Sequence, residues 1–492
     1  MEASIALNRF ALGGRPGDAP PENPKRWLID QLDAYQPRPP AIAAAPTTTA
    51  VAQGLADYFQ ELRQGRMQLR QAGGMQAPSA SMQPAVMTGQ RQRNPAMRSL
   101  RMETARETRA DGRAHYVDAV GARMEAVMRT PAPFVERLVH FWANHFAVSA
   151  DKLTVVGLAG TMEFDAIRPH VLGKFADMLM AVERHPAMLL YLDQAQSVGP
   201  NSPLGQQVSG RSNRRVGLNE NLAREILELH TMGVGSGYTQ ADVTEFARAM
   251  TGWTAAGIGN GQAARVAGTR GEPGTFVFAP RLHEPGARTI LGKIYDQQGV
   301  AQANAVLADL ATHPATAKNI ATKLARHFSG DAPPAPLVAK LERAFLSSGG
   351  DLPTVYRALI DAPEAWAAGA PKFKTPWEWS VSTMRALGAQ SVDGQAMTGL
   401  LNQLGQPVWR PGSPAGYDDI AASWAGPDAL MRRVQAAERI ASQIRGDVDP
   451  RARAAQLFPA ALSDTTAQAI ARAESPAQGL ALMLVSPEML RR

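Results

Sequence analysis

The amino-acid sequence predicts a mostly α-helical, multi-helix globular protein with one short β-hairpin near residues 275–293. Three observations carry this prediction. Apolar residues recur at helical spacing along most of the chain, residues that start and end helices bracket these stretches, and strand-like sequence is confined to 275–278 and 289–292 beside a Pro/Gly turn. With 492 residues, the chain is long enough to bury a large core.

The N-terminal part alternates helical and low-complexity sequence. We expect residues 1–36 to be a helical segment of the main fold. Residues 37–49 are mostly Pro, Ala and Thr, and residues 71–95 are rich in Met, Gln, Ala, Pro, Gly and Ser. Such sequence buries too little apolar surface to offset the entropy of ordering, so it predicts disordered or linker segments, with a helical island at 51–66 between them.

The chain therefore divides into three expected regions. Residues 1–36 belong to the main fold, and residues 37–97 form a linker with the helical island and a low-complexity basic segment. Residues 98–492 form the main α-helical domain, with a sub-boundary near 255–300.

The first helices of the main domain follow from proline positions and apolar stripes. Pro133 lies just inside a helix whose stripe runs to His145. A long helical region over 158–183 is interrupted by Pro169 and stops at His185-Pro186.

The later helices show caps. The helix at 219–232 is closed by glycines, and Thr239 caps the next one, with Asp242 as its partner in a capping box. Further helices are expected at 299–312, 314–328, 335–348, 352–361, 376–387, 427–445 and 465–484.

Composition excludes several classes of protein. Without cysteine, the chain has no disulfides, thiolate metal sites or cysteine nucleophiles. No apolar run approaches the roughly 20 residues of a membrane span, and no signal peptide is legible, so we expect a soluble, cytoplasmic protein. Arginine is in excess between Arg63 and Arg113, but few aromatic residues are interleaved there, so we expect a solvated basic segment and no nucleic-acid partner.

One helix carries a polar face that could bind a ligand. Asn221, Arg224, Glu225 and Glu228 recur at i, i+3, i+4 and i+7, which places them together. An amide, a guanidinium and two carboxylates can bind a metal, an anion or a substrate. The same pattern also fits a solvated stripe with an internal Arg/Glu pair.

Three histidines are further candidates. His145 shares the apolar stripe of its helix, whereas His140 shares a face with Glu136 and Asn144. His283 lies in the Pro/Gly turn of the expected hairpin, where loops often display functional groups. The alternatives are a hydrogen-bonded core histidine for His145 and a purely structural turn for His283.

The common metal and nucleophile motifs are missing. No HExxH occurs, and Glu228 and His230 are two residues apart, which is not the spacing of a carboxylate-bridged di-iron site. The chain also lacks a GxSxG elbow, an SxxK motif near an SDN and a Walker A loop. The cofactor therefore stays unknown, and a metal would need ligands such as His145 or His283.

Several motifs in a fixed order resemble a known family nearly from end to end. They are Ala6-Leu7-Asn8-Arg9-Phe10, Phe141-Trp142-Ala143-Asn144-His145-Phe146, Tyr191-Leu192-Asp193, the stretch 219–233, Gly237-Tyr238-Thr239-Gln240-Ala241-Asp242-Val243, Thr251-Gly252-Trp253, His283-Glu284-Pro285-Gly286 and Lys374-Thr375-Pro376. The chain thus resembles the bacterial "domain of unknown function 1800" family. The resemblance implies a mostly helical bacterial protein, exported in many members and often encoded beside a family with a sulfatase-like fold. A periplasmic location is therefore the alternative to a cytoplasmic one.

These residues lead to a hypothesis of a polar cleft between the helices of His145 and Glu225, with His283 at its mouth. Glu225 or Glu228 would be the general base, His145 or His283 the acid or a ligand, and Arg224 would hold an anionic group. The expected substrate-binding residues are Arg224, Asn221, Asn144, Tyr238 and Trp253.

Three functions fit the sequence. The first is a hydrolase-type site for an anionic or polar substrate. The second is a non-enzymatic binding or assembly protein that works with the sulfatase-like partner and uses its polar cluster as a buried network. The third is a metal-binding helical protein. The oligomeric state stays open.

Overall fold

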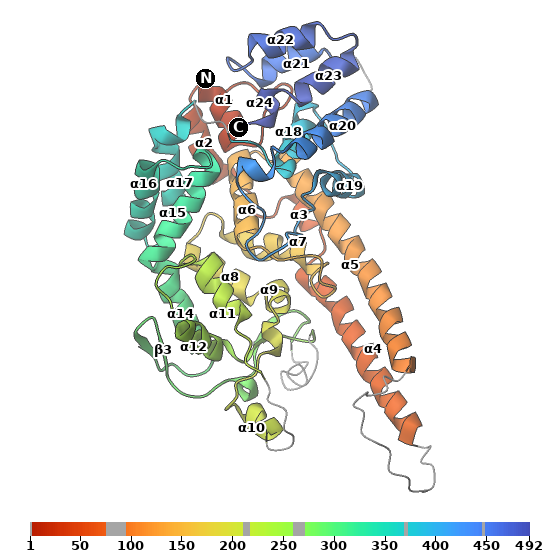
Figure 1. The fold of residues 1–492 in the computed structure, drawn as a ribbon, viewed down its shortest axis with the longest axis vertical. Coiled ribbons are helices and arrows are strands. Elements are labelled where there is room, and N and C mark those ends of the chain that lie inside the picture. Colours follow the sequence, from red (N-terminus) through yellow and green to blue (C-terminus); the bar gives the residue numbers. More distant parts are fainter. Residues whose placement is uncertain (1, 75–94, 210–216, 259–270, 369–371, 445–447) are drawn as a thin grey trace.

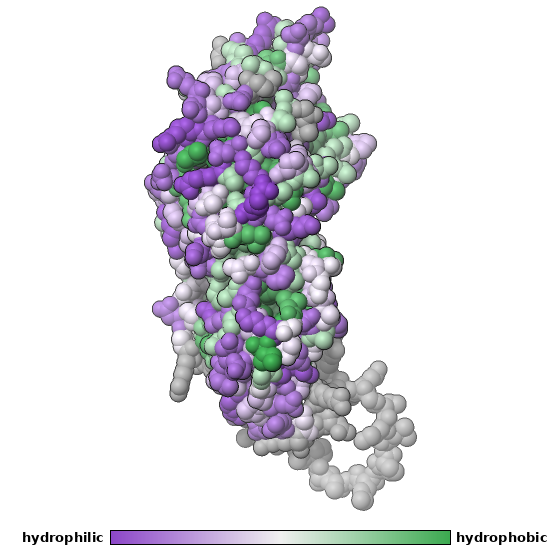
Figure 2. All heavy atoms as spheres, turned by 90° about the vertical axis from the view of Figure 1, so that its left-hand side faces the viewer, coloured by the Kyte–Doolittle hydropathy of each residue, from purple (hydrophilic) through white to green (hydrophobic). Residues whose placement is uncertain are grey.

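A computed structural model describes residues 2–74, 95–209, 217–258, 271–368, 372–444 and 448–492. The molecule is elongated and almost entirely helical, with a long two-helix arm that projects away from the body (Figure 1). In the described part of the chain, no helix is both long enough and apolar enough to cross a membrane. Hydrophilic and hydrophobic residues are interspersed over the face in Figure 2.

The N-terminal helices pack against later elements of the chain. They are α1 (Glu2–Ile5), the π-helix η1 (Ala6–Phe10), α2 (Pro24–Ala34) and α3 (Pro40–Ala43). Helix α2 contacts α6 (Pro133–His145) and α17 (Leu352–Asp361). Residues 37–49, expected as a linker, are ordered: α3 contacts α5, and Ile42 is fully buried. This correction arises because one isoleucine among prolines and alanines is enough to anchor a short segment, while Pro40 starts its helix.

The arm is a helical hairpin of α4 (Thr48–Gly74) and α5 (Pro95–Arg129). The helical island expected at 51–66 is confirmed and is part of the longer α4. At Gly65 the absence of a side chain admits Leu100 of α5, because a Cβ atom there would lie 2.1 Å from its Cδ2. Most of the low-complexity segment expected at 71–95 lies outside the described residues, except 71–74 in α4 and Pro95 in α5.

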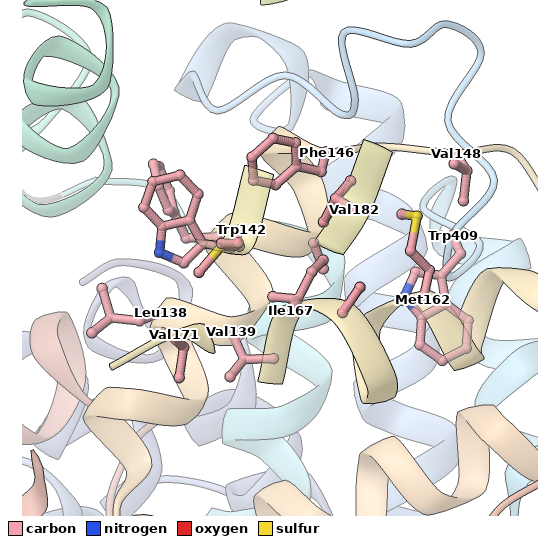
Figure 3. Close-up of a cluster of buried hydrophobic side chains, with 14 of the residues drawn as sticks. Leu138, Val139, Trp142, Phe146, Val148, Met162, Ile167, Val171, Val182 and Trp409 are labelled. Carbon is pink, nitrogen blue, oxygen red and sulfur yellow. The ribbon is translucent and has the colours of Figure 1, made fainter. Parts of the chain in front are cut away.

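The centre of the body is built on α6 (Pro133–His145), against which η2 (Glu163–Ile167) packs. The short helices that surround η2 or continue the chain are α7 (Leu158–Met162), η3 (Arg168–His170), α8 (Phe175–Arg184), α9 (Pro186–Tyr191) and η4 (Gln194–Gln196). Helix α10 (Pro203–Ser209) lies farther from α6 and packs against η6 (Pro280–Leu282). Trp142 and Phe146 meet Ile167, Val171 and Val182 in one continuous core (Figure 3).

The helix expected at 219–232 changes its winding partway. It begins as α11 (Asn221–Glu225) and continues as the π-helix η5 (Ile226–His230). A π-turn bonds i to i+5, so it rotates the residues after it away from the positions that a regular α-helix gives them. The next helix, α12 (Gln240–Met250), starts with the expected capping box of Thr239 and Asp242.

Two small antiparallel sheets replace the single expected hairpin. Strand β1 (Trp253–Ala255) pairs with β2 (Phe276–Phe278), and β3 (Arg288–Ile290) pairs with β4 (Lys293–Tyr295). The expected pairing of 275–278 with 289–292 is wrong, because Leu291 and Gly292 both have positive φ and form the two-residue turn of a tight hairpin on their own. A 3-10 turn, η6 (Pro280–Leu282), follows β2.

The C-terminal half alternates helices that mostly begin at proline. They are α14 (Val300–Thr312), α15 (Pro314–Ser329), α16 (Ala335–Ser348), α17 (Leu352–Asp361), η7 (Pro363–Trp366), α18 (Pro376–Ala386), α19 (Gly394–Leu404), η8 (Ala421–Ser423), α20 (Pro427–Gln443), α21 (Pro450–Leu457), α22 (Asp464–Ala471), α23 (Pro476–Leu484) and α24 (Pro487–Leu490). The helix expected at 465–484 is two helices, because Ser475 caps and Pro476 begins the second.

Candidate functional site

A cavity of about 260 Å³ lies against α6 in the body of the protein. Helix α6 contributes Arg137, His140 and Asn144, which share one face at i, i+3 and i+7. Helix α15 contributes a second face at i, i+3 and i+4, consisting of Lys323, Arg326 and His327. The remaining walls are the start of α18, Arg123 of α5 and the segment 406–419.

His327 is held by a carboxylate. Its Nδ1 lies 2.9 Å from Oδ2 of Asp419 and 3.4 Å from Nη2 of Arg492. The shorter contact favours the tautomer in which Nδ1–H donates to Asp419, which leaves Nε2 as an acceptor. Burial lowers the pKa of His327 to about 4, although Asp419 acts in the opposite direction, so the ring is neutral at pH 7. Its Nε2 is buried and has no hydrogen-bond partner among the described residues.

The neutral ring of His140 is the other tautomer. Its Nδ1 accepts a hydrogen bond of 3.1 Å from Nε1 of Trp377, so the proton of the neutral ring is on Nε2. That Nε2 is also buried, and no group of the described chain accepts its hydrogen. Burial, followed by nearby positive charges such as Arg123, lowers the pKa of His140 well below its usual value.

His145 joins a lysine to the π-turn of η5. Its Nε2 lies 3.1 Å from the carbonyl oxygen of His230, to which it donates, so Nδ1 is free to accept from Nζ of Lys323 at 3.1 Å. Nζ of Lys323 also donates to the carbonyl of Leu229. Burial and Arg326 lower the pKa of Lys323 to about 8. The cavity thus contains an ammonium group that loses its proton near neutral pH.

Buried ion pairs fix the cationic side chains of the lining. Arg137 contacts Glu378, and Glu378 also lies 2.8 Å from Nε of Arg492. These two guanidinium groups hold the pKa of Glu378 far below its ordinary value, although burial opposes them. Nη2 of Arg137 and Nε of Arg326 have no acceptor within the described chain, so donor capacity remains beside the cavity.

Arg123 is held by a different set of contacts. Its Nε donates to Glu163 at 3.0 Å, and its guanidinium lies over the rings of Trp377 and Trp409, 4.3 and 5.2 Å from their centroids. Nε1 of Trp409 donates to the same Glu163. This arrangement fixes a positive charge in the wall without exposing it to bulk water.

Asn144 fixes the segment that closes the cavity. Its Nδ2 donates to the carbonyl of Tyr417, and its Oδ1 accepts from the backbone N–H of Tyr417, both at 2.8 Å. Gly416 permits this close approach, because it has φ +80° and a Cβ atom there would lie 2.3 Å from the carbonyl oxygen of Asn144.

Of the side chains singled out from the sequence, His140, His145 and Asn144 line the cavity. The polar face of α11 does not. Arg224 lies 3.3 Å from Glu220 and 3.6 Å from Glu228, and it also donates to Gln240. These contacts match the alternative of a solvated stripe with an internal Arg/Glu pair. Glu225 is half-buried, and burial raises its pKa.

The other predicted residues also lie outside the lining. Asn221 is exposed, and Tyr238 contacts the α11 stripe at Glu228. His283 places Nδ1 2.9 Å from the carbonyl of Thr251, and Trp253 is buried in β1. The cleft expected between the helices of His145 and Glu225, with His283 at its mouth, therefore does not coincide with this cavity.

The cavity residues that the sequence did not suggest are chiefly Lys323, Arg326, His327, Trp377 and Asp419. Their spacing on α15 was visible, but nothing local indicated that Asp419 would meet His327. As for metals, the described residues contain no group of three or more His, Asp or Glu side chains arranged to hold one.

Comparison with known proteins gives one match. A family model described as "Protein of unknown function (DUF1800)" matches residues 5–491. Neither a curated protein nor a solved structure matches the chain.

Proposed function

The chain belongs to this DUF1800 family, whose function is unknown, and from the geometry of its cavity we propose that it is a hydrolase for small anionic substrates. The observation that carries the proposal is a concentration of unsatisfied buried polar atoms in one lining. They are Nη2 of Arg137, Nε2 of His140, Nε of Arg326, Nε2 of His327 and Oδ1 of Asp419, of which the last is in an ion pair with Lys372. Buried polar groups are almost always paired in folded proteins, so such a group of orphans suggests that a ligand completes them.

The polarity of these atoms suggests their roles. Nε2 of His327 can accept a proton from a water molecule as that water attacks the substrate, while Asp419 stabilises the imidazolium that forms. Nζ of Lys323 or Nε2–H of His140 can return a proton to the leaving group. Arg137 and Arg326 supply donors for an anionic group. His145 would position Lys323, and Asn144 would hold the wall.

The cavity limits the size of the substrate. Its volume of about 260 Å³ lies just below the range of about 300–1,000 Å³ for pockets that bind drug-sized ligands. Apolar and aromatic side chains, including Phe141, Trp377 and Trp409, also line the cavity, together with polar and acidic ones such as Gln406 and Asp418. A small ester or amide with one anionic group fits this chemistry.

The test is hydrolysis of the anionic esters 4-nitrophenyl phosphate and 4-nitrophenyl sulfate, with the uncharged 4-nitrophenyl acetate for comparison. At least one anionic ester should be hydrolysed faster than the acetate relative to its rate in buffer, and His327→Gln should slow that reaction by at least about 100-fold, because a general base commonly contributes that much. The matched control is His283→Gln, which changes a histidine outside the cavity and should leave the rate unchanged. Equal rates for His327→Gln and the unmodified protein, or no hydrolysis of either anionic ester, would contradict the proposal.

The pH dependence of kcat/KM distinguishes a catalytic role of His327 and Lys323 from a purely structural one. The base must be unprotonated and the acid protonated, so kcat/KM should fall below pH about 4 for His327 and, if Lys323 is the acid, above pH about 8. Loss of the alkaline limb in Lys323→Met, with the acid limb retained, would identify the lysine as the acid. A profile without a fall between pH 5 and 3 would contradict the role of His327 as the base, and one without a fall between pH 7 and 9 would contradict the role of Lys323 as the acid.

The projecting arm favours a second candidate, the binding or assembly protein. Met67 and Met102 are 59% and 64% exposed on α4 and α5. Exposed, flexible apolar side chains are common at protein-binding surfaces. The partner to test is the sulfatase-like protein that the family resemblance suggests, by size-exclusion chromatography of the co-expressed pair. Met67→Lys together with Met102→Lys should prevent co-elution while His327→Gln should not.

A further inference from the structure

A second cavity, of about 320 Å³, lies where the arm joins the body. Helix α5 contributes Arg109, Arg113 and Tyr116, and α19 contributes Thr398 and Asn402. The segment 150–156 after α6 and Arg410 complete the lining. None of these residues lines the first cavity.

The lining of this second cavity is positively charged and only partly neutralised. Arg410 is paired with Asp151, whose Oδ1 accepts from Nε at 2.9 Å and from Nη2 at 2.6 Å. Arg109 and Arg113 form no ion pair or hydrogen bond with any described residue. They are one turn apart on α5, where two like charges repel each other. An anion between them would remove this repulsion.

Two hydrogen bonds to backbone carbonyls join the elements that form this cavity. The hydroxyl of Tyr116 donates to the carbonyl of Val408, and the N–H of Ala150 donates to the carbonyl of Trp409, both at 2.8 Å. Trp409 has φ +48°, and its ring packs in the apolar core (Figure 3). The next residue, Arg410, lines the second cavity, so one short segment forms a wall of both cavities.

Close packing also brings α5 against the segment 150–157. Gly112 lies between the two unpaired arginines, and a Cβ atom there would lie only 2.6 Å from Cγ1 of Val156. The helix can approach this closely because residue 112 has no side chain. Arg109 and Arg113, which are themselves exposed, flank this packed part of α5.

We propose that this second cavity binds the phosphate or sulfate group of a small molecule through Arg109, Arg113 and Arg410. Guanidinium groups match such oxyanions because they donate several parallel hydrogen bonds and keep their charge. Asn402, whose side chain has no partner in the described chain, supplies a neutral donor for the rest of the ligand. This inference does not depend on the hydrolase proposed above.

A nucleic acid is the less suitable occupant. Beyond the cavity, α5 carries Arg98, Arg101 and Arg106, but Glu103 and Glu107 are interspersed with them and are also exposed. A strip of mixed charge does not follow a phosphate backbone as a continuous basic surface would.

The experiment is isothermal titration of the full chain with sodium phosphate, sodium sulfate and glucose 6-phosphate, against sodium chloride at matched ionic strength. We expect saturable binding of at least one oxyanion, and Arg109→Gln with Arg113→Gln should weaken it by at least about tenfold. Preference for glucose 6-phosphate would indicate a phosphorylated organic ligand, and preference for the inorganic ions would indicate a free oxyanion.

The matched control is Arg101→Gln with Arg106→Gln, which removes the same charge from exposed positions of the same helix. The control should bind like the unmodified protein, and thermal melting should confirm that both variants are folded. Equal weakening in both double variants, no saturable binding, or tighter binding of a single-stranded oligonucleotide than of any small oxyanion would overturn the proposal.

Discussion

The polar stripe of α11 and the polar lining beneath α6 contain similar residue types in different surroundings. On α11, Arg224 meets Glu220 and Glu228, each four residues away, and all three side chains are at least one-quarter exposed. Around α6, Arg137 meets Glu378, 241 residues away, and His327 meets Asp419, 92 residues away. Arg137 and Glu378 are buried and His327 is nearly so, whereas the side chain of Asp419 is 24% exposed.

The two sets of contacts differ in how much stability is lost when one partner is removed. Water can replace a lost partner on α11, so an exposed pair contributes little to stability. A buried charge that loses its partner stays without compensation, because solvent cannot reach it. The buried cluster should therefore be sensitive to single substitutions and the exposed stripe insensitive, although the stripe is the more conspicuous in the sequence.

The largest effect is expected for the pair of Arg168 and Glu136. Two hydrogen bonds of 2.6 and 2.8 Å join them, and neither side chain is exposed by more than 1%. Glu136→Gln would leave the guanidinium without a counter-charge, so the free energy of unfolding should fall by about 3–5 kcal/mol in urea denaturation. The control is Asp428→Asn, which breaks an exposed pair with Arg432 and should cost less than about 1 kcal/mol. Similar losses in the two variants would remove the distinction between buried and exposed pairs.

The next effect concerns the buried histidines. Burial lowers the pKa of His185 to about 3 and that of His327 to about 4, whereas an unfolded histidine titrates near 6.5. Below pH 6.5 the unfolded chain binds protons that the folded chain does not, so stability present at pH 7 is lost as the pH falls. Each of these histidines should cost about 2 kcal/mol at pH 5, measured by urea denaturation. The loss should be smaller in His327→Asn, and an unchanged slope would show that this ring does not titrate as inferred.

A smaller loss of stability is expected at Asn144 than at the buried charges, and a still smaller one at Asn221, although the sequence suggested both asparagines as substrate-binding residues. Asn144→Ala removes both hydrogen bonds to the backbone of Tyr417, so unfolding should become easier by about 2 kcal/mol. Asn221→Ala removes an exposed amide at the start of α11 and should change stability by less than about 0.5 kcal/mol. Thermal melting of the two variants measures the contrast, and a reversed order would show that the α11 stripe is the more tightly packed cluster.

Sequence reasoning succeeded where the signal was local. Helices α16 and α17 lie at the expected residues, and the capping box of Thr239 and Asp242 forms as expected, because caps and helix-starting prolines act within a few residues. The strand pairing failed because Leu291-Gly292 is not one of the usual turn sequences, so the tight hairpin of β3 and β4 was not visible.

The cavity could be predicted only in part. His145 and Asn144 were chosen from one helix and do line it, and the spacing of Lys323, Arg326 and His327 was available on another. The contacts of the lining residues with Asp419 and Glu378 could not be predicted from the sequence, since those contacts depend on the packing of elements far apart in the sequence. The π-turn of η5, which brings the carbonyl of His230 to His145, also has no recognised sequence signal.

The smallest change in stability is expected for a substitution in the polar stripe of α11. Arg224→Gln removes a charge whose carboxylate partners, Glu220 and Glu228, are partly exposed, so the free energy of unfolding should change by less than about 1 kcal/mol. At 1 M salt the Debye length is about 3 Å, so even that difference between variant and unmodified protein should disappear in a urea titration. Hydrolysis of the chromogenic esters should be unchanged as well. If Arg224→Gln instead abolished hydrolysis while stability stayed constant, the anion-binding role would belong to α11, and the unsatisfied atoms beneath α6 would need a structural explanation.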